Sequence, residues 1–376
     1  MQEKTKRITG SVGFMPVWWK AEMGITFPNP WKTDIDQLVE IEMECERRLH
    51  ERYPDLPLGS ENPVGVYPVL NPDGRIVCAM AFGLPEPAWN EDEGMFWFDR
   101  NRCPLAWVET PQDVKKINVP DWEAQPFVCM ALEKANQAES RRTYSLPKEK
   151  PSIWEMTFPR TGKTCRFSVF FSFIDVGNFL CGTEKFLTML AGEPDTAHAL
   201  LDKCFQLSTS YTEFMHRIFG IEKVEGLSSF GGDFSCLLSP AQYKEYAMAF
   251  DMKLVDRYGR LPCNLHSCGP SKHLYEVWAT YPNLSDIVVM QTRGIPGELR
   301  KLRKLMPHTF LQITLHPPQF DFERESPEKV RRTVLQCAQD AEYRDISLSV
   351  FVVQPGPKVD ENIRAFYSAL DEVNSG

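Results

Sequence analysis

The residues best suited to chemistry lie in segment 263–269, Cys-Asn-Leu-His-Ser-Cys-Gly, which contains His266 and Cys268. Side chains two apart on an extended strand point to the same side, so these two groups can converge on one ligand. Imidazole and thiolate both bind zinc, and a catalytic zinc keeps three protein ligands and one open position. We therefore expect an active site organised around His266 and Cys268, against the alternative that both are ordinary buried residues.

A second polar segment, 230–236, reads Phe-Gly-Gly-Asp-Phe-Ser-Cys and follows the apolar run 224–230. The two glycines permit a tight turn beside a ligand, and Asp233 would then project from the end of a strand. The alternative is an aspartate that caps its own turn. We expect Asp233 to act in catalysis and in substrate binding.

Elements that alternate between apolar strands and amphipathic helices must position these segments. Strands are predicted at 166–173, 224–230, 262–265, 287–290, 310–315 and 346–353, and helices at 195–219, 240–258, 271–281, 296–305, 327–342 and 360–373. Strands that are each followed by a helix favour parallel βα units that close into a barrel, whose functional groups lie at the carboxyl ends of the strands. A doubly wound sheet is the alternative, but no Gly-x-Gly-x-x-Gly opens a helix.

The first part of the chain is irregular and rich in proline and tryptophan. We predict a strand at 12–19, a helix capped at Thr33 or Asp34, a hairpin of 64–70 with 75–81, and a short helix after Thr110. Strands from this part can bring the total to the eight strands of a closed barrel. We expect one barrel domain over residues 1–376, with 1–160 as its irregular, aromatic-rich extension and 161–376 as regular βα repeats.

Bulk composition excludes several classes of protein. The 376 residues carry a formal net charge of −9 with acidic and basic residues well mixed, which argues against a nucleic-acid-binding protein. No apolar run approaches the length of a bilayer span, and we do not expect the charged N-terminal segment to act as a signal peptide. The 11 cysteines are an odd number and are expected to be reduced thiols. A cytoplasmic protein with no membrane association is predicted.

Four segments together resemble the uroporphyrinogen decarboxylase superfamily: 174–184, 224–255, 266–269 and 360–365. The resemblance covers residues 160–376 well and the first part loosely. It implies a (β/α)₈ barrel of the TIM type with a deep central cleft.

The decarboxylases of that superfamily carry an arginine-rich motif near the N-terminus that binds the carboxylates of the porphyrinogen. The equivalent segment here, 16–25, contains Lys20 and no arginine. A single lysine cannot replace bidentate clamps, so porphyrinogen decarboxylation is the alternative rather than the preferred function.

The resemblance is greater to the corrinoid-dependent methyltransferases of the superfamily, in which His-x-Cys and a distant Cys hold zinc. His266 and Cys268 match the first two ligands, but Val352 stands near the expected position of the third. Either another residue completes the site or the metal has been lost. The candidates for the third ligand are Asp233 and His316, followed by Cys236 and Cys337.

A site with one thiolate fewer suits methylation of a thiol less well, although a methylcobamide:thiol methyltransferase stays an alternative. The opposite direction moves a methyl group from a small methylated donor to a corrinoid on a partner protein. Its leaving group needs a Lewis acid or a proton, from zinc or from a protonated Asp233. Trp18 and Trp19, expected at the end of the first strand, favour a flat substrate and so O-demethylation of a methoxyaromatic compound. A binding or regulatory protein without the catalytic metal is the remaining alternative.

Overall fold

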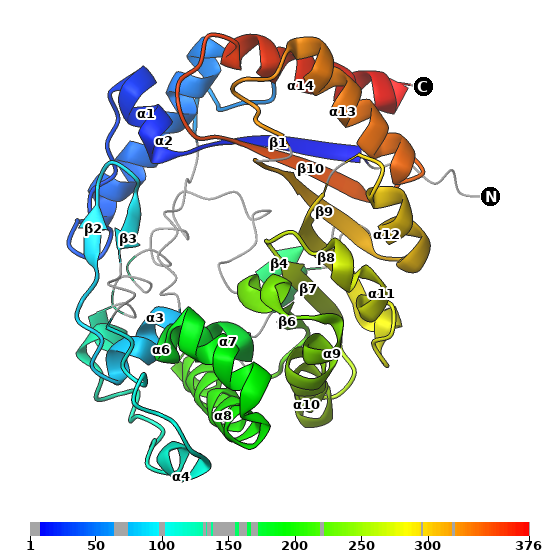
Figure 1. Ribbon diagram of the computed structural model, residues 1–376. Coiled ribbons are helices and arrows are strands. Elements are labelled where there is room, and N and C mark those ends of the chain that lie inside the picture. The colour runs from blue at the N-terminus through cyan, green and yellow to red at the C-terminus, as the bar shows by residue number, and fades with distance from the viewer. Residues whose placement is uncertain are drawn as a thin grey trace.

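A parallel sheet forms the centre of the molecule (Figure 1). The structure is a computed structural model that describes residues 8–63, 74–97, 102–130, 133, 137, 155–157, 164–166, 172–218, 222–294, 296–317 and 320–375. Within these residues the sheet has six strands in the order β1-β10-β9-β8-β7-β6, every adjacent pair being parallel. The strands are β1 (Ile8–Phe14), β6 (Leu227–Gly231), β7 (Cys263–Ser267), β8 (Ile287–Arg293), β9 (Phe310–Leu315) and β10 (Ile346–Val352).

The strand order distinguishes a barrel from a doubly wound sheet. Strands β6 to β10 are neighbours in chain order without the reversal that a doubly wound sheet requires. The first strand, β1, pairs with the last, β10, from Ile8↔Ile346 to Phe14↔Val352, as in a sheet that closes on itself. Two further strands were expected at 64–70 and 166–173. Residues 64–70 and most of 166–173 lie outside the described residues.

Helices cover the outside of the sheet (Figure 1). Those that follow the strands are α9 (Pro240–Gln242), α10 (Ala249–Tyr258), α11 (Tyr275–Trp278), α12 (Leu299–Leu305), α13 (Pro327–Asp340) and α14 (Val359–Ser375). A π-helical turn (Tyr243–Met248) joins α9 to α10, so a single helical segment follows β6. A capping box at Ser239 begins this segment, and Gly259 ends it. Local capping signals therefore set the ends of this segment.

The first half of the chain packs as helices and short hairpins beside the sheet. Its elements are α1 (Pro16–Met23), α2 (Ile35–Arg52), α3 (Gly74–Ala81), β2 (Ala88–Asn90), β3 (Met95–Trp97), α4 (Pro111–Val114), β4 (Glu155–Thr157), β5 (Thr164–Arg166), α6 (Phe173–Cys181), α7 (Thr183–Gly192) and α8 (Pro194–Ile218). The Asp34 cap of α2 and the Thr110 cap of α4 are confirmed.

Two predictions in this half are wrong. The strand expected at 12–19 ends at Phe14, because Pro16 begins helix α1 with its fixed φ at the first helical position. The segment 75–81, expected as half of a hairpin, belongs to helix α3. Its continuous apolar run fits a buried helix as well as a strand.

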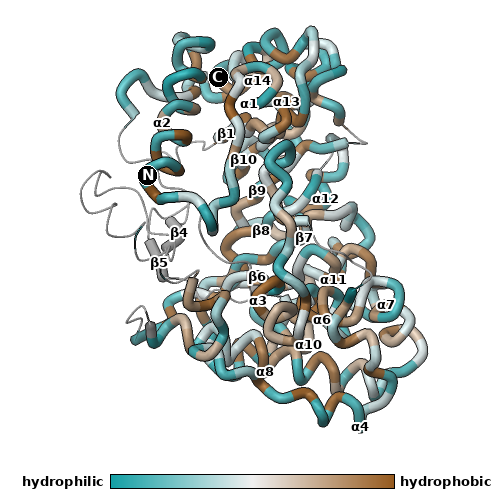
Figure 2. The backbone as a smooth tube through the Cα atoms, turned by 90° about the vertical axis from the view of Figure 1, so that its left-hand side faces the viewer, coloured by the Kyte–Doolittle hydropathy of each residue, from teal (hydrophilic) through white to brown (hydrophobic). Residues whose placement is uncertain are grey.

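Side chains alternate along the strands between a core face and the barrel interior. On β10, Leu348 and Val350 are fully buried, whereas Ser347 and Ser349, which alternate with them, line a cavity. Hydrophobic and hydrophilic stretches also alternate along α8, as expected of a helix with one apolar face (Figure 2). The apolar core therefore lies between sheet and helices, and the barrel interior is lined by both polar and apolar side chains. Among the described helices, none is both long and apolar enough to cross a membrane.

Candidate metal and substrate site

A tight turn at the end of β6 delivers Asp233 to the site. Gly231 and Gly232 have φ of 80° and 108°, the left-handed region that favours glycine. A Cβ on Gly232 would lie 2.2 Å from Ser172 Oγ and 2.9 Å from Asp175 Oδ1, so a side chain cannot fit there. Asp233 then opens a short 3₁₀ helix (Asp233–Leu237) with its carboxylate directed to the end of β7. The tight turn that the sequence predicted at these glycines is present, and it packs against Ser172 and Asp175.

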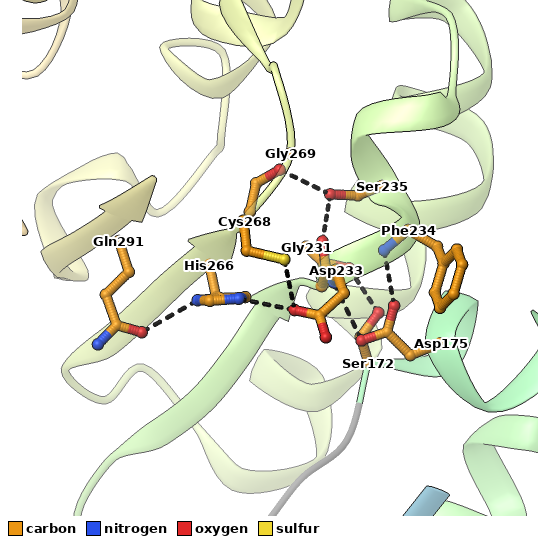
Figure 3. A network of polar contacts seen from close by, with 12 residues as sticks. Ser172, Asp175, Gly231, Asp233, Phe234, Ser235, His266, Cys268, Gly269 and Gln291 are labelled. Carbon is orange, nitrogen blue, oxygen red and sulfur yellow. Dashed lines mark hydrogen bonds and ion pairs between the residues drawn. The ribbon is translucent and has the colours of Figure 1, made fainter. Parts of the chain in front are cut away.

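Strand β7 brings the other two side chains to Asp233 (Figure 3). His266 Nε2 lies 2.7 Å from Asp233 Oδ1, and Cys268 Sγ donates to the same oxygen over 3.2 Å. One nitrogen, one sulfur and one oxygen ligand atom lie within 4.8 Å of one another. All three residues are partly buried. Among the described residues, these three form the one cluster of three or more His, Cys, Asp or Glu side chains that could hold a metal ion.

Neighbouring residues fix the orientation of each member. Gln291 Oε1 accepts a hydrogen bond from His266 Nδ1 over 3.1 Å, which leaves Nε2 directed at Asp233. Arg75, from α3, donates to Asp233 Oδ2 over 2.6 Å. The carboxylate of Asp175, from α6, accepts the backbone N–H groups of Asp233 and Phe234 over 3.0 and 2.9 Å. Asp233 Oδ1 is thus the oxygen that faces the other two side chains.

The charges of this group are strongly coupled. Burial alone would raise the pKa of Asp233, but the hydrogen bond from His266 and the charge of Arg75 hold it well below its usual range. Burial alone would lower the pKa of His266, yet its hydrogen bonds to Asp233 and Cys268 raise it to about 10. Asp233 is therefore ionised at neutral pH, and the role of protonated acid that the sequence suggested for it does not fit. In the absence of metal, both protonated His266 and the Cys268 thiol donate to Asp233.

The carboxylate behind Asp233 has the opposite environment. Burial and the nearby charge of Asp233 raise the pKa of Asp175 to about 6. The Arg75 guanidinium, 3.6 Å from Asp175 Oδ2 and 2.6 Å from Asp233 Oδ2, is the cation shared by both carboxylates. Arg75 is therefore a structural counter-charge for the site.

The donor set fits zinc. In tetrahedral zinc sites, with bonds of about 2.0–2.3 Å, ligand atoms lie roughly 3.3–3.7 Å apart. The separations here are 2.7 Å for His266–Asp233 and 3.2 Å for Cys268–Asp233. Small side-chain rotations would open this space, and the ion would replace the protons on His266 Nε2 and Cys268 Sγ. The second oxygen of Asp233 and the second nitrogen of His266 already have partners, as ligands of a metal usually do.

A cavity of about 660 Å³ adjoins this group, and His266 and Cys268 are among the residues that line it. Asp233, His266 and Cys268 are called the metal-type group below. His316, the other candidate third ligand, also lines the cavity, but its Nδ1 lies 2.9 Å from Pro317 O and it does not belong to the metal-type group. Val352, where the resemblance places a cysteine, is fully buried on the core face of β10, while Phe351 and Val353 line the cavity. Asp233 is thus the residue that lies beside the pair.

The two tryptophans expected to bind substrate lie elsewhere. Trp18 and Trp19 are on α1, 0% and 6% exposed, and neither is among the residues that line the cavity. Trp18 packs against Phe14, with ring centroids 4.3 Å apart, and Arg52 lies over its ring. The physical reason is the helix that Pro16 begins, which turns these side chains into the core. The weaker candidate Cys337 is buried in α13, and Cys236 Sγ donates to Asp233 O.

Sequence reasoning missed four residues of this region: Arg75, Asp175, Gln291 and Arg293. Gln291 and Arg293 carried a signal, since polar side chains at alternate positions of an otherwise apolar strand indicate an inward face. Arg75 and Asp175 lie 158 and 58 residues before Asp233, and no local pattern links them to it.

Comparison with known proteins identifies the family. The family model described as uroporphyrinogen decarboxylase (URO-D) matches residues 165–371. Among solved structures, a methyltransferase from Methanosarcina mazei superposes with a TM-score of 0.56 at 13% sequence identity, covering 97% of this chain and 92% of that chain. This likeness concerns the fold, an α/β barrel of the TIM type. No curated protein sequence matches the chain significantly. The matched segment spans more than half of the residues, and the chain belongs to the uroporphyrinogen decarboxylase family.

Proposed function

We propose that this protein is a methyltransferase that moves a methyl group from a small methylated donor to a corrinoid carried by a partner protein. The observation that carries the proposal is the convergence of Asp233, His266 and Cys268 at the carboxyl end of β6 and β7, where barrel enzymes place their chemistry. These three residues would hold zinc, which supplies a Lewis acid that polarises the heteroatom losing its methyl group.

The other residues of the site keep the three ligands in place. Gln291 holds the His266 ring by its Nδ1, and Arg75 binds the Asp233 oxygen that faces away from Cys268. The Asp175 carboxylate holds the backbone at 233–234. An arrangement fixed before the substrate arrives lowers the cost of reaching the reactive geometry. With one thiolate among three ligands, the site suits demethylation of a donor better than methylation of a thiol.

The size and charge of the cavity bear on the substrate. Its volume of about 660 Å³ is within the usual range for small-molecule sites and suits a methoxyaromatic donor, although the buried Trp18 and Trp19 no longer support that choice. Of the described lining residues, Arg293 is the one arginine. A porphyrinogen with many carboxylates would need more counter-charges than this, so decarboxylation stays the less favoured alternative.

Metal analysis and a methyl-transfer assay test the proposal together. We expect about one zinc per chain, lost in His266→Ala and kept in His308→Ala, whose ring is on the exposed surface. Free Co(I) cobalamin serves as the acceptor, and the loss of its Co(I) absorbance reports methyl transfer from methoxyaromatic donors. Parent protein without zinc, or a His266→Ala variant that transfers methyl as fast as the parent, would contradict the zinc-assisted mechanism. Turnover of uroporphyrinogen would establish the alternative.

A further inference from the structure

One cation in the cavity has no partner within the described structure. Arg293 is the last residue of β8, beyond Gln291 on the same inward face. It lines the 660 Å³ cavity and also a neighbouring cavity of about 570 Å³, so it lies where the two meet. Its guanidinium forms no hydrogen bond or ion pair with any described residue. This separates it from Arg75, which carboxylates already neutralise.

The rest of the first cavity offers no negative charge to Arg293. Its described lining contains neither aspartate nor glutamate. Apart from Cys268 of the proposed zinc site, the lining consists of two histidines, Arg293, hydroxyl and amide side chains and the apolar side chains of Met15, Phe351 and Val353. In the second cavity, Glu298 is held by Lys272. A partly buried guanidinium without an anion costs desolvation energy that a bound anion would recover.

The polar groups of the site favour a carboxylate. A guanidinium binds a carboxylate through two parallel hydrogen bonds, and here a single arginine provides one such fork. Hydroxyl groups of Thr314 and Ser349 line the same cavity and can bind the remaining polar groups of a ligand. Arg293 and His266 both line this one cavity, so a ligand held at one end by Arg293 can extend toward the metal-type group.

We propose that Arg293 is the specificity-determining residue of the cavity and that the methyl donor carries a carboxylate which Arg293 binds. The proposal rests on the methyltransferase function proposed above, which it narrows to acidic donors such as methoxybenzoates. Arg293 takes no part in the chemical step; it anchors the end of the donor that does not react.

Binding measurements with matched acids and amides test the proposal without turnover. The probes are para- and meta-methoxybenzoate, each compared with its neutral methoxybenzamide by isothermal titration calorimetry on the full chain. We expect the parent to prefer the acids by about tenfold or more, the usual size of a charge-assisted pair. The preference should disappear in Arg293→Gln, be partly kept in Arg293→Lys, and be unchanged in Arg324→Gln, a control on the exposed surface. Circular dichroism spectra establish that each variant is folded.

Equal affinities of acid and amide for every pair in the parent would overturn the proposal, as would a preference of unchanged size in Arg293→Gln. These results are independent of the methyl-transfer assay. A protein that prefers acids through Arg293 but methylates no corrinoid would contradict the proposed function and leave the carboxylate site standing. A protein that methylates cobalamin from neutral donors with no preference for acids would support the proposed function and contradict the carboxylate site.

Discussion

The two sides of the barrel cavity differ in how far their polar groups are already engaged. On the side of β6 and β7, Asp233 contacts His266, Cys268 and Arg75 at once, and each contact is charged or charge-assisted. On the side of β9, β10 and β1, the polar groups are mainly hydroxyls. The hydroxyls of Thr314 and Ser349 contact each other over 3.2 Å, and those of Ser11 and Ser347 form no hydrogen bond with a described residue.

This difference separates two tasks. Groups that are interlocked before a ligand arrives suit a metal and its chemistry, which require fixed geometry. Loosely engaged hydroxyls, together with the unpartnered Arg293, suit recognition of a ligand that brings its own polar groups. We therefore expect substitutions on the β6–β7 side to change metal binding, and substitutions on the opposite side to change ligand affinity alone.

The largest expected effect is that of removing the thiolate. Cys268→Ala should weaken zinc binding by more than the roughly 10–100-fold typical of outer-shell changes, because a direct ligand is lost. Ser347→Ala, on the opposite side, should leave zinc affinity unchanged. Competition with a chromophoric chelator measures both affinities, with the exposed Cys129→Ala as the matched cysteine control. Equal zinc affinity in Cys268→Ala and the parent would contradict the assignment of metal binding to the β6–β7 side of the cavity.

A smaller effect is expected at Gln291, which touches the histidine and not the metal. Gln291→Leu removes the acceptor for His266 Nδ1 and should weaken zinc binding about 10–100-fold. Gln291→Glu keeps an acceptor at the same place and should retain most of the affinity. The same chelator titration distinguishes the two variants. Similar losses in both would assign Gln291 a packing role instead.

Trp18 tests whether the aromatic first helix belongs to the site or to the core. Trp18→Phe should lower the free energy of unfolding by about 1–2 kcal/mol, since it shrinks a fully buried side chain. Zinc and ligand affinities should not change. Urea denaturation and the calorimetric titrations provide the two measurements. Weaker ligand binding with unchanged stability would instead indicate that Trp18 contributes to substrate binding.

The smallest effect concerns the support behind β6. Burial raises the pKa of Asp251 to about 7, even though Tyr281 and the backbone of Gly231 donate to its carboxylate. A carboxyl group whose pKa is higher in the folded state stabilises the fold while it is protonated, and that contribution is lost as pH rises through about 7. Asp251→Asn should therefore show a smaller fall in melting temperature between pH 5 and pH 8 than the parent, by a few degrees. An identical pH dependence in both proteins would mean that Asp251 is not the group responsible.

Local signals explain what the sequence predicted well. Strand β9 has the predicted bounds, and the cap at Thr110 lies where its short motif indicated. These features depend on residues within a few positions of one another. The pairing of His266 with Cys268 was predictable for the same reason, since strand periodicity relates them.

Features that depend on distant contacts were not predictable in the same way. The environment of Asp233 comes from Arg75 and Asp175, on helices far earlier in the chain, and their charges fix its ionised state. The segment that holds Arg75 was expected to be a strand. Which residue supplies the third ligand also depends on where side chains point in the folded chain. Val352 lies on the core face of β10, whereas the Asp233 side chain points across to β7.

The central claim is that Asp233, His266 and Cys268 together bind one zinc ion. Zinc K-edge X-ray absorption on the zinc-loaded full chain tests it most directly. We predict a shell with a single sulfur at about 2.3 Å and nitrogen or oxygen neighbours at about 2.0–2.1 Å, the sulfur being absent in Cys268→Ser. A shell with no sulfur, or with two or more, would contradict this ligand set.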